Sequence, residues 1–172
     1  MKQTIEIEIE VPDGYKAVYD ENTQRVEIVM RPIKFRGWNE KNKRWLYGAY
    51  LVNRGFPYIF EDGIQSPFAE PADFMVGEDT VGQFTGLKDK NGTEIYEGDI
   101  IRYEEHEGYL LESFIAEVVF ENGAFGYRRK NSMLGGIEVF EPFCEHDCLK
   151  EDFLDYVEVV GDVYDDKKWL DV

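Results

Sequence analysis

Apolar residues at every second position open the chain and predict β-structure. From Ile5 to Val11 they alternate with glutamates, a period of two that places one face of a strand in a core and the other in water. The alternation returns over residues 15–19 and 26–30 on either side of a polar cluster, which predicts a hairpin. We therefore expect a three-stranded N-terminal unit over residues 1–32. About thirty residues bury too little surface for independent stability, so this unit should pack on the rest of the chain or on a second copy.

The next segment combines a hairpin with a long stretch that lacks periodicity. Trp38 and Trp45 flank a polar, lysine-rich turn, and the apolar residues around them alternate loosely with basic ones. This pattern predicts a hairpin. Residues 53–80 contain several glycines and prolines without a clear repeat, so we expect a loop with at most short strands. A loop of this length in a compact domain is either functional or variable between relatives.

Turn-forming residues divide the stretch from Gln83 to Tyr103. Asn91-Gly92 lies between two apolar segments and supplies residues that accept positive φ at low cost. A second bend is predicted at Glu97-Gly98-Asp99, and the apolar residues that follow it predict a strand. We expect the rest of the domain to be organised around this stretch.

Short strands and turns continue through the C-terminal part. Apolar residues alternate from Phe114 to Phe120, residues 121–124 form a turn signal, and Phe125 begins the return strand. Residues 149–156 carry apolar side chains at near-helical spacing and predict one short helix, and residues 157–163 predict a last strand. Several short strands with glycine-rich turns at this spacing are typical of a small barrel or sandwich.

Four segments match a known family in the same order along the chain. They are Ile33–Trp38, Phe84–Ile101, Glu117–Phe120 and Glu158–Tyr164. Together they resemble the signature of the YopX-like proteins, which are encoded largely by phages and prophages. The resemblance implies a phage or prophage origin and an SH3-type β-barrel over residues 33–172, but no activity and no catalytic residue. The expected fold is thus mainly β, a small SH3-type β-barrel domain with an N-terminal β-hairpin appendage and one short C-terminal helix.

The net charge limits the partners that the surface as a whole favours. The chain has 19 basic and 36 acidic residues, for a formal net charge of −17. A field of this sign disfavours approach to nucleic acid and to anionic membranes, and it suits a partner with a basic face. No apolar run is long enough for a membrane helix, and two cysteines are too few for a disulfide framework. We expect a cytoplasmic protein without membrane contact.

One basic segment stands out against this acidic background. Residues 33–54 contain six basic residues and one acidic residue, with two tryptophans among them. Small barrels that bind nucleic acid combine cations for phosphate with aromatic rings for bases. The alternative is that the tryptophans are core residues and the cations form a solvated face. The candidate binding patch consists of Lys34, Arg36, Trp38, Lys41, Lys43, Arg44, Trp45 and Lys88. Residues 128–130 extend it if the fold brings them near.

No residue pattern predicts catalysis or a bound metal. Cys144 and Cys148 flank His146, but a closed zinc site takes four ligands from separated short motifs, and the remaining histidine, His106, has no motif around it. Adjacent acidic pairs such as Glu104-Glu105 point to opposite faces of a strand and are better explained as solvated charges. The sequence has no phosphate-binding loop, nucleophile elbow or H-E-x-x-H pattern. We therefore assign no catalytic residue, no metal ligand and no cofactor.

Three functions stay open from the sequence. The first hypothesis is a non-enzymatic protein-binding module of phage or prophage origin, which acts in the host cytoplasm on another protein or on a second copy of itself. The second is a nucleic-acid-binding accessory factor that uses residues 34–45, although the net charge disfavours it. The third is an enzyme with an unrecognised site, and it has the least support.

Overall fold

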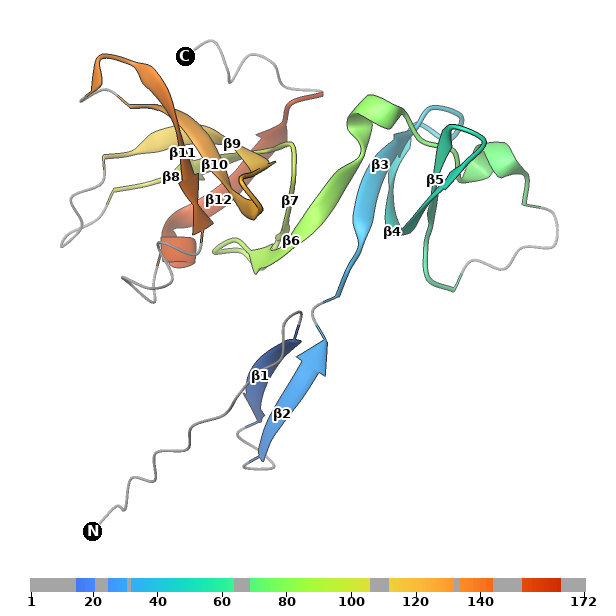
Figure 1. Ribbon diagram of the computed structural model, residues 1–172, viewed down its shortest axis with the longest axis horizontal. Helices are drawn as coiled ribbons and strands as arrows, with labels where there is room; N and C mark the ends of the chain where they lie inside the picture. The colour runs from blue at the N-terminus through green and yellow to red at the C-terminus, as the bar shows by residue number, and fades with distance from the viewer. Residues whose placement is uncertain are drawn as a thin grey trace. The chain divides into compact units, whose positions relative to one another are not determined.

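The computed structural model describes residues 15–20, 25–30, 32–63, 69–105, 112–131, 134–143 and 153–164. The chain divides into two compact units, Met1–Pro32 and Ile33–Val172. Figure 1 labels the strands of both units. We call them the N-terminal unit and the C-terminal unit.

The N-terminal unit contains a β-hairpin. Strands β1 (Tyr15–Asp20) and β2 (Arg25–Met30) pair antiparallel, from Tyr15 opposite Met30 to Asp20 opposite Arg25. The alternation of apolar residues predicted this hairpin correctly. The further strand predicted from Ile5 to Val11 lies outside the described residues.

The first sheet of the C-terminal unit has five antiparallel strands in the order β5-β4-β3-β6-β7 (Figure 1). They are β3 (Phe35–Asn39), β4 (Arg44–Asn53), β5 (Phe56–Phe60), β6 (Gly82–Lys88) and β7 (Glu94–Tyr96). Trp38 pairs with Trp45 across β3 and β4, which confirms the predicted hairpin. The stretch 53–80, predicted as a loop with at most short strands, contains β5 and two 3-10 turns, η1 (Pro71–Asp73) and η2 (Glu78–Thr80).

A tight turn joins β4 to β5 inside that stretch. Asn53 pairs with Phe56, and the two residues between them, Arg54 and Gly55, have φ values of 52° and 83°. Positive φ at both central positions is what a type I′ hairpin turn requires, and this turn matches the twist of the flanking strands. β4 and β5 therefore form a regular hairpin although glycine and proline interrupt the apolar pattern.

The second sheet has the strand order β11-β10-β9-β8-β12. Its strands are β8 (Asp99–Tyr103), β9 (Phe114–Glu121), β10 (Ala124–Asn131), β11 (Ile137–Pro142) and β12 (Val157–Asp162). The predicted turn between β9 and β10 is confirmed, with φ of 51° at Asn122 and 85° at Gly123. Of the helix predicted over residues 149–156, the described part is a 3-10 turn, η4 (Phe153–Tyr156). No helix in the described part of the chain is long and apolar enough to cross a membrane.

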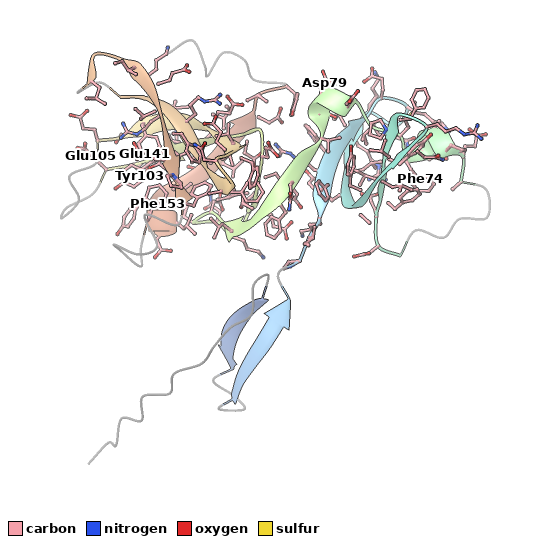
Figure 2. All side chains as sticks on the ribbon, in the orientation of Figure 1. Phe74, Asp79, Tyr103, Glu105, Glu141 and Phe153 are labelled. Atoms are coloured by element: carbon pink, nitrogen blue, oxygen red, sulfur yellow. The ribbon has the colours of Figure 1, made fainter. Side chains whose placement is uncertain are left out.

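The two sheets have apolar cores of different size. The larger core lies against the second sheet and has nine buried residues, one of which is Ile95 of β7. The rings of Tyr103 and Phe153 stack in this core with centroids 5.3 Å apart (Figure 2). Tyr127 stacks on Phe153 in the same cluster, with centroids 5.7 Å apart. On the first sheet the buried cluster consists of Leu46, Ile59 and Val76.

The central stretch links the first sheet to the second through Asp89. One carboxylate oxygen of Asp89 accepts hydrogen bonds from the backbone N–H groups of Asn91 and Thr93, each at 2.8 Å, and so closes the predicted turn. The other oxygen accepts the N–H of Val159 on β12 at 3.0 Å. Burial acts to raise the pKa of Asp89, but these N–H groups outweigh it and hold the pKa below its usual value. The turn therefore covers the outer edge of β12.

The fold class is mainly β, as predicted. Every strand pairing in the described residues is antiparallel. The described strands form two open five-stranded sheets and a separate hairpin, without a closed barrel. The SH3-type barrel that the family resemblance implies stays a prediction.

Candidate functional site

One face of the first sheet is unusually rich in aromatic side chains. Residues that pair directly across neighbouring strands point to the same face, and so do residues two positions apart on one strand. Arg36 pairs with Tyr47, and Leu51 pairs with Tyr58, so β3, β4 and β5 all contribute to this face. We define it as the aromatic face, made of Arg36, Trp38, Trp45, Tyr47, Leu51, Phe56, Tyr58 and Phe60. The opposite face carries the small core of this sheet.

The outer part of the aromatic face is exposed. Leu51 is 52% exposed, Phe56 is 56% exposed and Phe60 is 40% exposed. The Phe60 ring also contacts Phe74, with centroids 5.0 Å apart, and Figure 2 places Phe74 near β5. Large apolar side chains that gather on one exposed face are typical of interaction sites.

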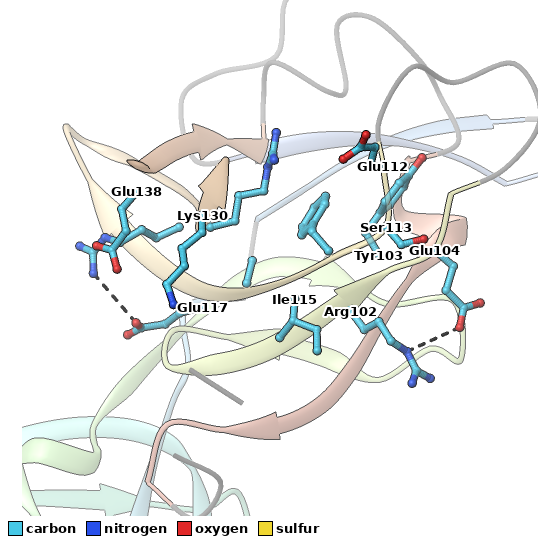
Figure 3. Close-up of a pocket in the computed structure, with 13 residues that line it drawn as sticks. Arg102, Tyr103, Glu104, Glu112, Ser113, Ile115, Glu117, Lys130 and Glu138 are labelled. Atoms are coloured by element: carbon cyan, nitrogen blue, oxygen red, sulfur yellow. Dashed lines mark ion pairs between the residues drawn. The ribbon is translucent and has the colours of Figure 1, made fainter. Parts of the chain in front are cut away.

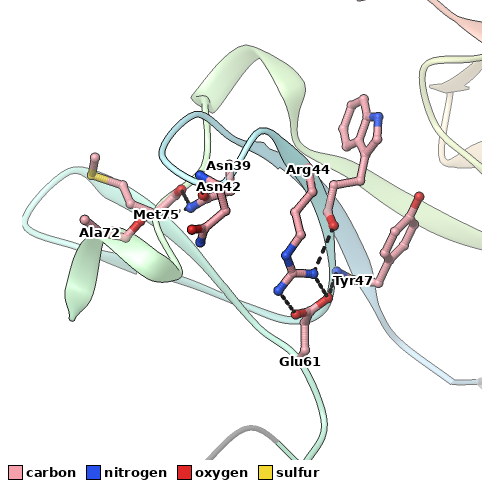
Figure 4. Close-up of polar contacts among 8 residues, drawn as sticks. Asn39, Asn42, Arg44, Tyr47, Glu61, Ala72 and Met75 are labelled. Carbon is pink, nitrogen blue, oxygen red and sulfur yellow. Dashed lines mark hydrogen bonds and ion pairs between the residues drawn. The ribbon is translucent and has the colours of Figure 1, made fainter. Parts of the chain in front are cut away.

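The edge of β5 that does not face β4 is covered by residues 74–76. The N–H of Ile59 donates to the carbonyl of Phe74 at 2.8 Å, and the N–H of Val76 donates to the carbonyl of Pro57 at 3.1 Å. The amide of the fully buried Asn39 fixes this segment by donating to the carbonyls of Ala72 and Met75 (Figure 4). This edge of β5 is therefore already paired where these hydrogen bonds form.

The inner part of the aromatic face is buried around Arg36. The Arg36 side chain is 8% exposed, and its guanidinium lies 4.8 Å from the ring centroid of Trp45 and 5.3 Å from that of Tyr96. It forms an ion pair with Asp99 and donates to the carbonyl of Glu97 at 3.3 Å. Its Nε has no hydrogen-bond partner among the residues that the structure describes. Arg36 thus joins the first sheet to the bend that precedes β8.

Asp99 is the buried partner of this arginine. It is 1% exposed, and its carboxylate accepts the backbone N–H of Tyr96 at 2.7 Å. Burial raises the pKa of Asp99 to about 6, although Arg36 and the Tyr96 N–H act in the opposite direction. Removing one member of a buried ion pair costs about 3–5 kcal/mol, so the Arg36 and Asp99 contact also holds the fold together.

A cavity of about 420 Å³ opens beside this ion pair. Trp45, Tyr47 and Tyr96 form its aromatic wall, and its carboxylates are Glu94, Asp99 and Asp162. The pairing register of β12 shifts between Val159 and Gly161, which also line the cavity. Such bulges are frequent next to binding sites. Three of the four segments that carry the family resemblance supply lining residues.

The pKa values of Tyr47, Tyr96 and Glu94 are shifted from their usual values. Burial raises the pKa of Tyr47 and of Tyr96 above their usual values, so both hydroxyls stay protonated at neutral pH. The Tyr96 hydroxyl donates to Glu94 at 2.8 Å, and Lys34 forms an ion pair with the same carboxylate. Burial acts to raise the pKa of Glu94, but these two contacts prevail and lower it.

A second cavity, of about 600 Å³, lies on the second sheet (Figure 3). Arg102 forms ion pairs there with Glu158 at 2.8 Å and Glu104 at 3.5 Å, and Arg128 lies 4.0 Å from Glu117. Burial raises the pKa of Glu117 against the influence of Arg128. The lining has four basic and four acidic side chains, so its charges select no ligand class.

The basic residues predicted as a nucleic-acid patch are mostly paired with carboxylates. Arg44 holds Glu61 with two hydrogen bonds of 2.9 and 2.6 Å (Figure 4), and Lys41 lies 2.7 Å from Asp73. The remaining ion pairs of the patch are Lys34 with Glu94, Arg36 with Asp99 and Lys43 with Glu40. Lys88 makes no ion pair within the described residues.

The two tryptophans of the predicted patch meet each other. Trp38 and Trp45 contact edge to face, with centroids 5.8 Å apart, and both lie on the aromatic face. In the proposed extension of the patch, Arg128 pairs with Glu121, and Arg129 lies 2.6 Å from Glu141. The nucleic-acid site stays a prediction, with few free cations to support it.

The sequence analysis selected Arg36 and Trp45 but missed the rest of the cavity. Tyr96, Asp99 and Asp162 come from segments 51 or more positions away from Trp45 along the chain, so no local spacing joins them to it. The Glu97-Gly98-Asp99 bend was the available signal for Asp99. Cys144, Cys148 and His106, which the sequence analysis considered as metal ligands, lie outside the described residues. The described residues include no group of three or more His, Cys, Asp or Glu that could bind a metal.

Comparison with known proteins identifies relatives of the C-terminal unit. A family model described as YopX protein matches residues 34–171. No curated protein matches the chain. Among solved structures, the crystal structure of protein EF1440 from Enterococcus faecalis is similar, with 26% identity over 81% of this chain and 98% of that chain and a TM-score of 0.46. The family match includes the aromatic face and its cavity, and it leaves out the N-terminal unit.

Proposed function

The chain belongs to the YopX protein family, and we propose that it acts as a non-enzymatic protein-binding module whose contact surface is the aromatic face. In this proposal the module is of phage or prophage origin and acts in the cytoplasm of the host cell. The phage or prophage origin and the host cytoplasm are what the resemblance to YopX-like proteins implies, and the family match supports them only in that way. The choice of a protein partner depends on the surface itself.

The observation that carries the proposal is the exposure of Leu51, Phe56 and Phe60 on one face of a regular hairpin. The buried cluster of this sheet lies on the opposite face, and these three side chains are not part of it. Covering the exposed part of one such side chain contributes about 1 kcal/mol to association. Aromatic residues are also enriched where protein interfaces are tightest.

The pairing of the basic residues favours protein over nucleic acid as the partner. Affinity for phosphate requires cations that can release counterions. Arg44 and Lys41 already hold carboxylates, and Arg36 is buried with Asp99. The net charge of −17 acts in the same direction.

Site-specific crosslinking tests the proposed surface. Phe56 is replaced by the photoreactive amino acid p-benzoylphenylalanine, and the protein is irradiated in nuclease-treated lysate of the host cells. The matched control carries the same amino acid at Ile137, which is 63% exposed on β11 of the second sheet. We expect a discrete protein adduct from position 56 and none from position 137.

Three other outcomes would overturn the proposal. Equal adducts from both positions would mean that the crosslinker reports exposure alone. An adduct with the mass of two copies of the chain would make the face a self-association surface. An adduct from position 56 that forms only in lysate not treated with nuclease would favour the nucleic-acid hypothesis instead.

A further inference from the structure

We propose that the N-terminal hairpin joins two copies of the chain, with one face of the hairpin packed against the same face of the other copy. The inference goes beyond the proposed function, because β1 and β2 contribute no residue to the aromatic face. The family model matches residues 34–171 and so describes the C-terminal unit without the hairpin. A separate role for the hairpin is consistent with this match.

The pairing register of the hairpin places apolar residues together. Residues directly opposite in an antiparallel pair share a face, and successive residues of a strand lie on opposite faces. Ala17 pairs with Ile28, and the pairs two positions away on either side are apolar on both strands as well. We define the apolar hairpin face as Tyr15, Ala17, Tyr19, Val26, Ile28 and Met30.

The other face of the hairpin has a different composition. Each of its three cross-strand pairs includes at least one charged residue; the pairs are Lys16 with Val29, Val18 with Glu27 and Asp20 with Arg25. A shift of the register by one residue would mix charged and apolar residues on both faces. Such a separation is typical of a sheet with one face in water and the other face covered.

A hairpin of two strands needs a second layer over its apolar face. β1 and β2 pair with each other and belong to no larger sheet in the described part of the chain (Figure 1). A two-stranded sheet alone is at best marginally stable in water, and packing against another element stabilises it. The apolar hairpin face therefore calls for a covering surface that is itself apolar.

A second copy of the hairpin provides a surface of this kind. In a two-fold interface the same patch serves both chains, so a face without charged residues is complementary to itself. Six residues from each copy bury on the order of 1,000 Å² in total, which is near the lower limit for a specific interface. The product is a four-stranded sandwich with one apolar layer between the two hairpins.

The charge of the hairpin permits this contact in an acidic protein. Residues 15–30 contain two basic and three acidic residues, whereas the whole chain has a net charge of −17. Like-charge repulsion between two copies is therefore weak at the hairpin. The charged residues of β1 and β2 lie on the face that stays in water in the sandwich.

Sedimentation equilibrium of the full-length protein tests the association. We expect the mean mass to rise with concentration from 20.1 kDa towards twice that value. Ile28→Glu puts a carboxylate in the middle of the apolar hairpin face of both copies, and we expect it to weaken dimerisation by more than about 100-fold. Val29→Glu is the matched control, because it adds the same charge at the next position, opposite Lys16 on the other face. It should change the dissociation constant by less than about threefold.

Photocrosslinking gives a signal that a misfolded variant cannot imitate. p-Benzoylphenylalanine replaces Tyr19 on the apolar hairpin face or Val18 on the other face, and the purified protein is irradiated. We expect position 19 to give an adduct with the mass of two chains, in which mass spectrometry places the link within residues 15–30 of the other copy. Position 18 should give no such adduct.

The outcomes separate this inference from the proposed function. A monomer at every concentration, equal weakening by the two glutamate variants, or a crosslink from position 19 to residues of the C-terminal unit would overturn the hairpin dimer. None of these results would change a crosslink between position 56 and a partner protein. Conversely, a hairpin dimer that gives no crosslink from position 56 would remove the aromatic face as a protein contact and leave the dimer in place.

Discussion

The core on the second sheet and the β4–β5 hairpin of the first sheet use their aromatic residues in different ways. On the second sheet Tyr103, Tyr127 and Phe153 are at least 96% buried and stack on one another in a core of nine buried residues. On the first sheet the buried cluster has three members, and Phe56 and Phe60 stay exposed. The contrast indicates that the larger core supplies most of the stability, whereas the β4–β5 hairpin exposes large apolar side chains.

The largest expected effect comes from breaking the core of the second sheet. Tyr127→Ala removes a fully buried ring from the stack, and we expect it to lower the free energy of unfolding by about 4 kcal/mol. Urea denaturation followed by circular dichroism measures the change. Tyr58→Ala, on the aromatic face, is the matched control and should cost far less. Similar losses in the two variants would remove the contrast between the sheets.

Breaking the link between the sheets should have the next largest effect. Arg36→Met leaves Asp99 buried without its cation, and we expect a loss of about 3 kcal/mol in the free energy of unfolding. Adding Asp99→Leu to this variant should restore much of the stability, because no unpaired charge then remains. A double variant as unstable as the single one would show that the ion pair is not what joins the sheets here.

Asp89 should stabilise the protein in a pH-dependent way. In Asp89→Asn one of the two carboxylate oxygens becomes an amide NH2 group, which cannot accept a hydrogen bond from the Val159 N–H. We expect this variant to lower the free energy of unfolding by about 2 kcal/mol at neutral pH. Because the pKa of Asp89 is lowered in the folded state, its contribution is complete above the unfolded pKa of about 4 and is lost as the pH falls through the folded value. The difference between wild type and variant should therefore shrink on acidification below pH 4. A difference that is constant with pH would contradict this role.

The smallest effect on stability is expected on the aromatic face. Leu51→Ser with Phe56→Ser should change the free energy of unfolding by no more than about 0.5 kcal/mol, because both side chains are largely exposed. Thermal unfolding checks this expectation. A large loss would mean that these side chains belong to the structure and not to an interface.

Local patterns predicted the hairpins but not the site. Trp38 with Trp45 and the turn at Asn122-Gly123 were readable because each hairpin is specified by residues close in sequence. β5 was only partly foreseen, since Pro57 weakens the signal of a strand and is tolerated here next to a covered edge.

The long-range contacts required the structure. Arg36 and Asp99 are 63 positions apart, and Asp89 reaches Val159 across 70 positions. Sequence periodicity fixes which residues face a core, but it does not fix which strands become neighbours. The position of the cavity next to the aromatic face follows from which strands are neighbours, so it could not be predicted from the sequence.

The most direct test of the binding surface is affinity capture from nuclease-treated host-cell lysate with three forms of the protein. These are the wild type, the Leu51→Ser and Phe56→Ser variant, and a Leu134→Ser and Ile137→Ser variant that removes exposed apolar side chains from the segment before β11 and from the first residue of β11. The account predicts that the wild type and the second-sheet variant retain the same discrete protein and that the aromatic-face variant loses it. Retention of that protein by all three forms would contradict the assignment of the aromatic face as the protein-binding surface.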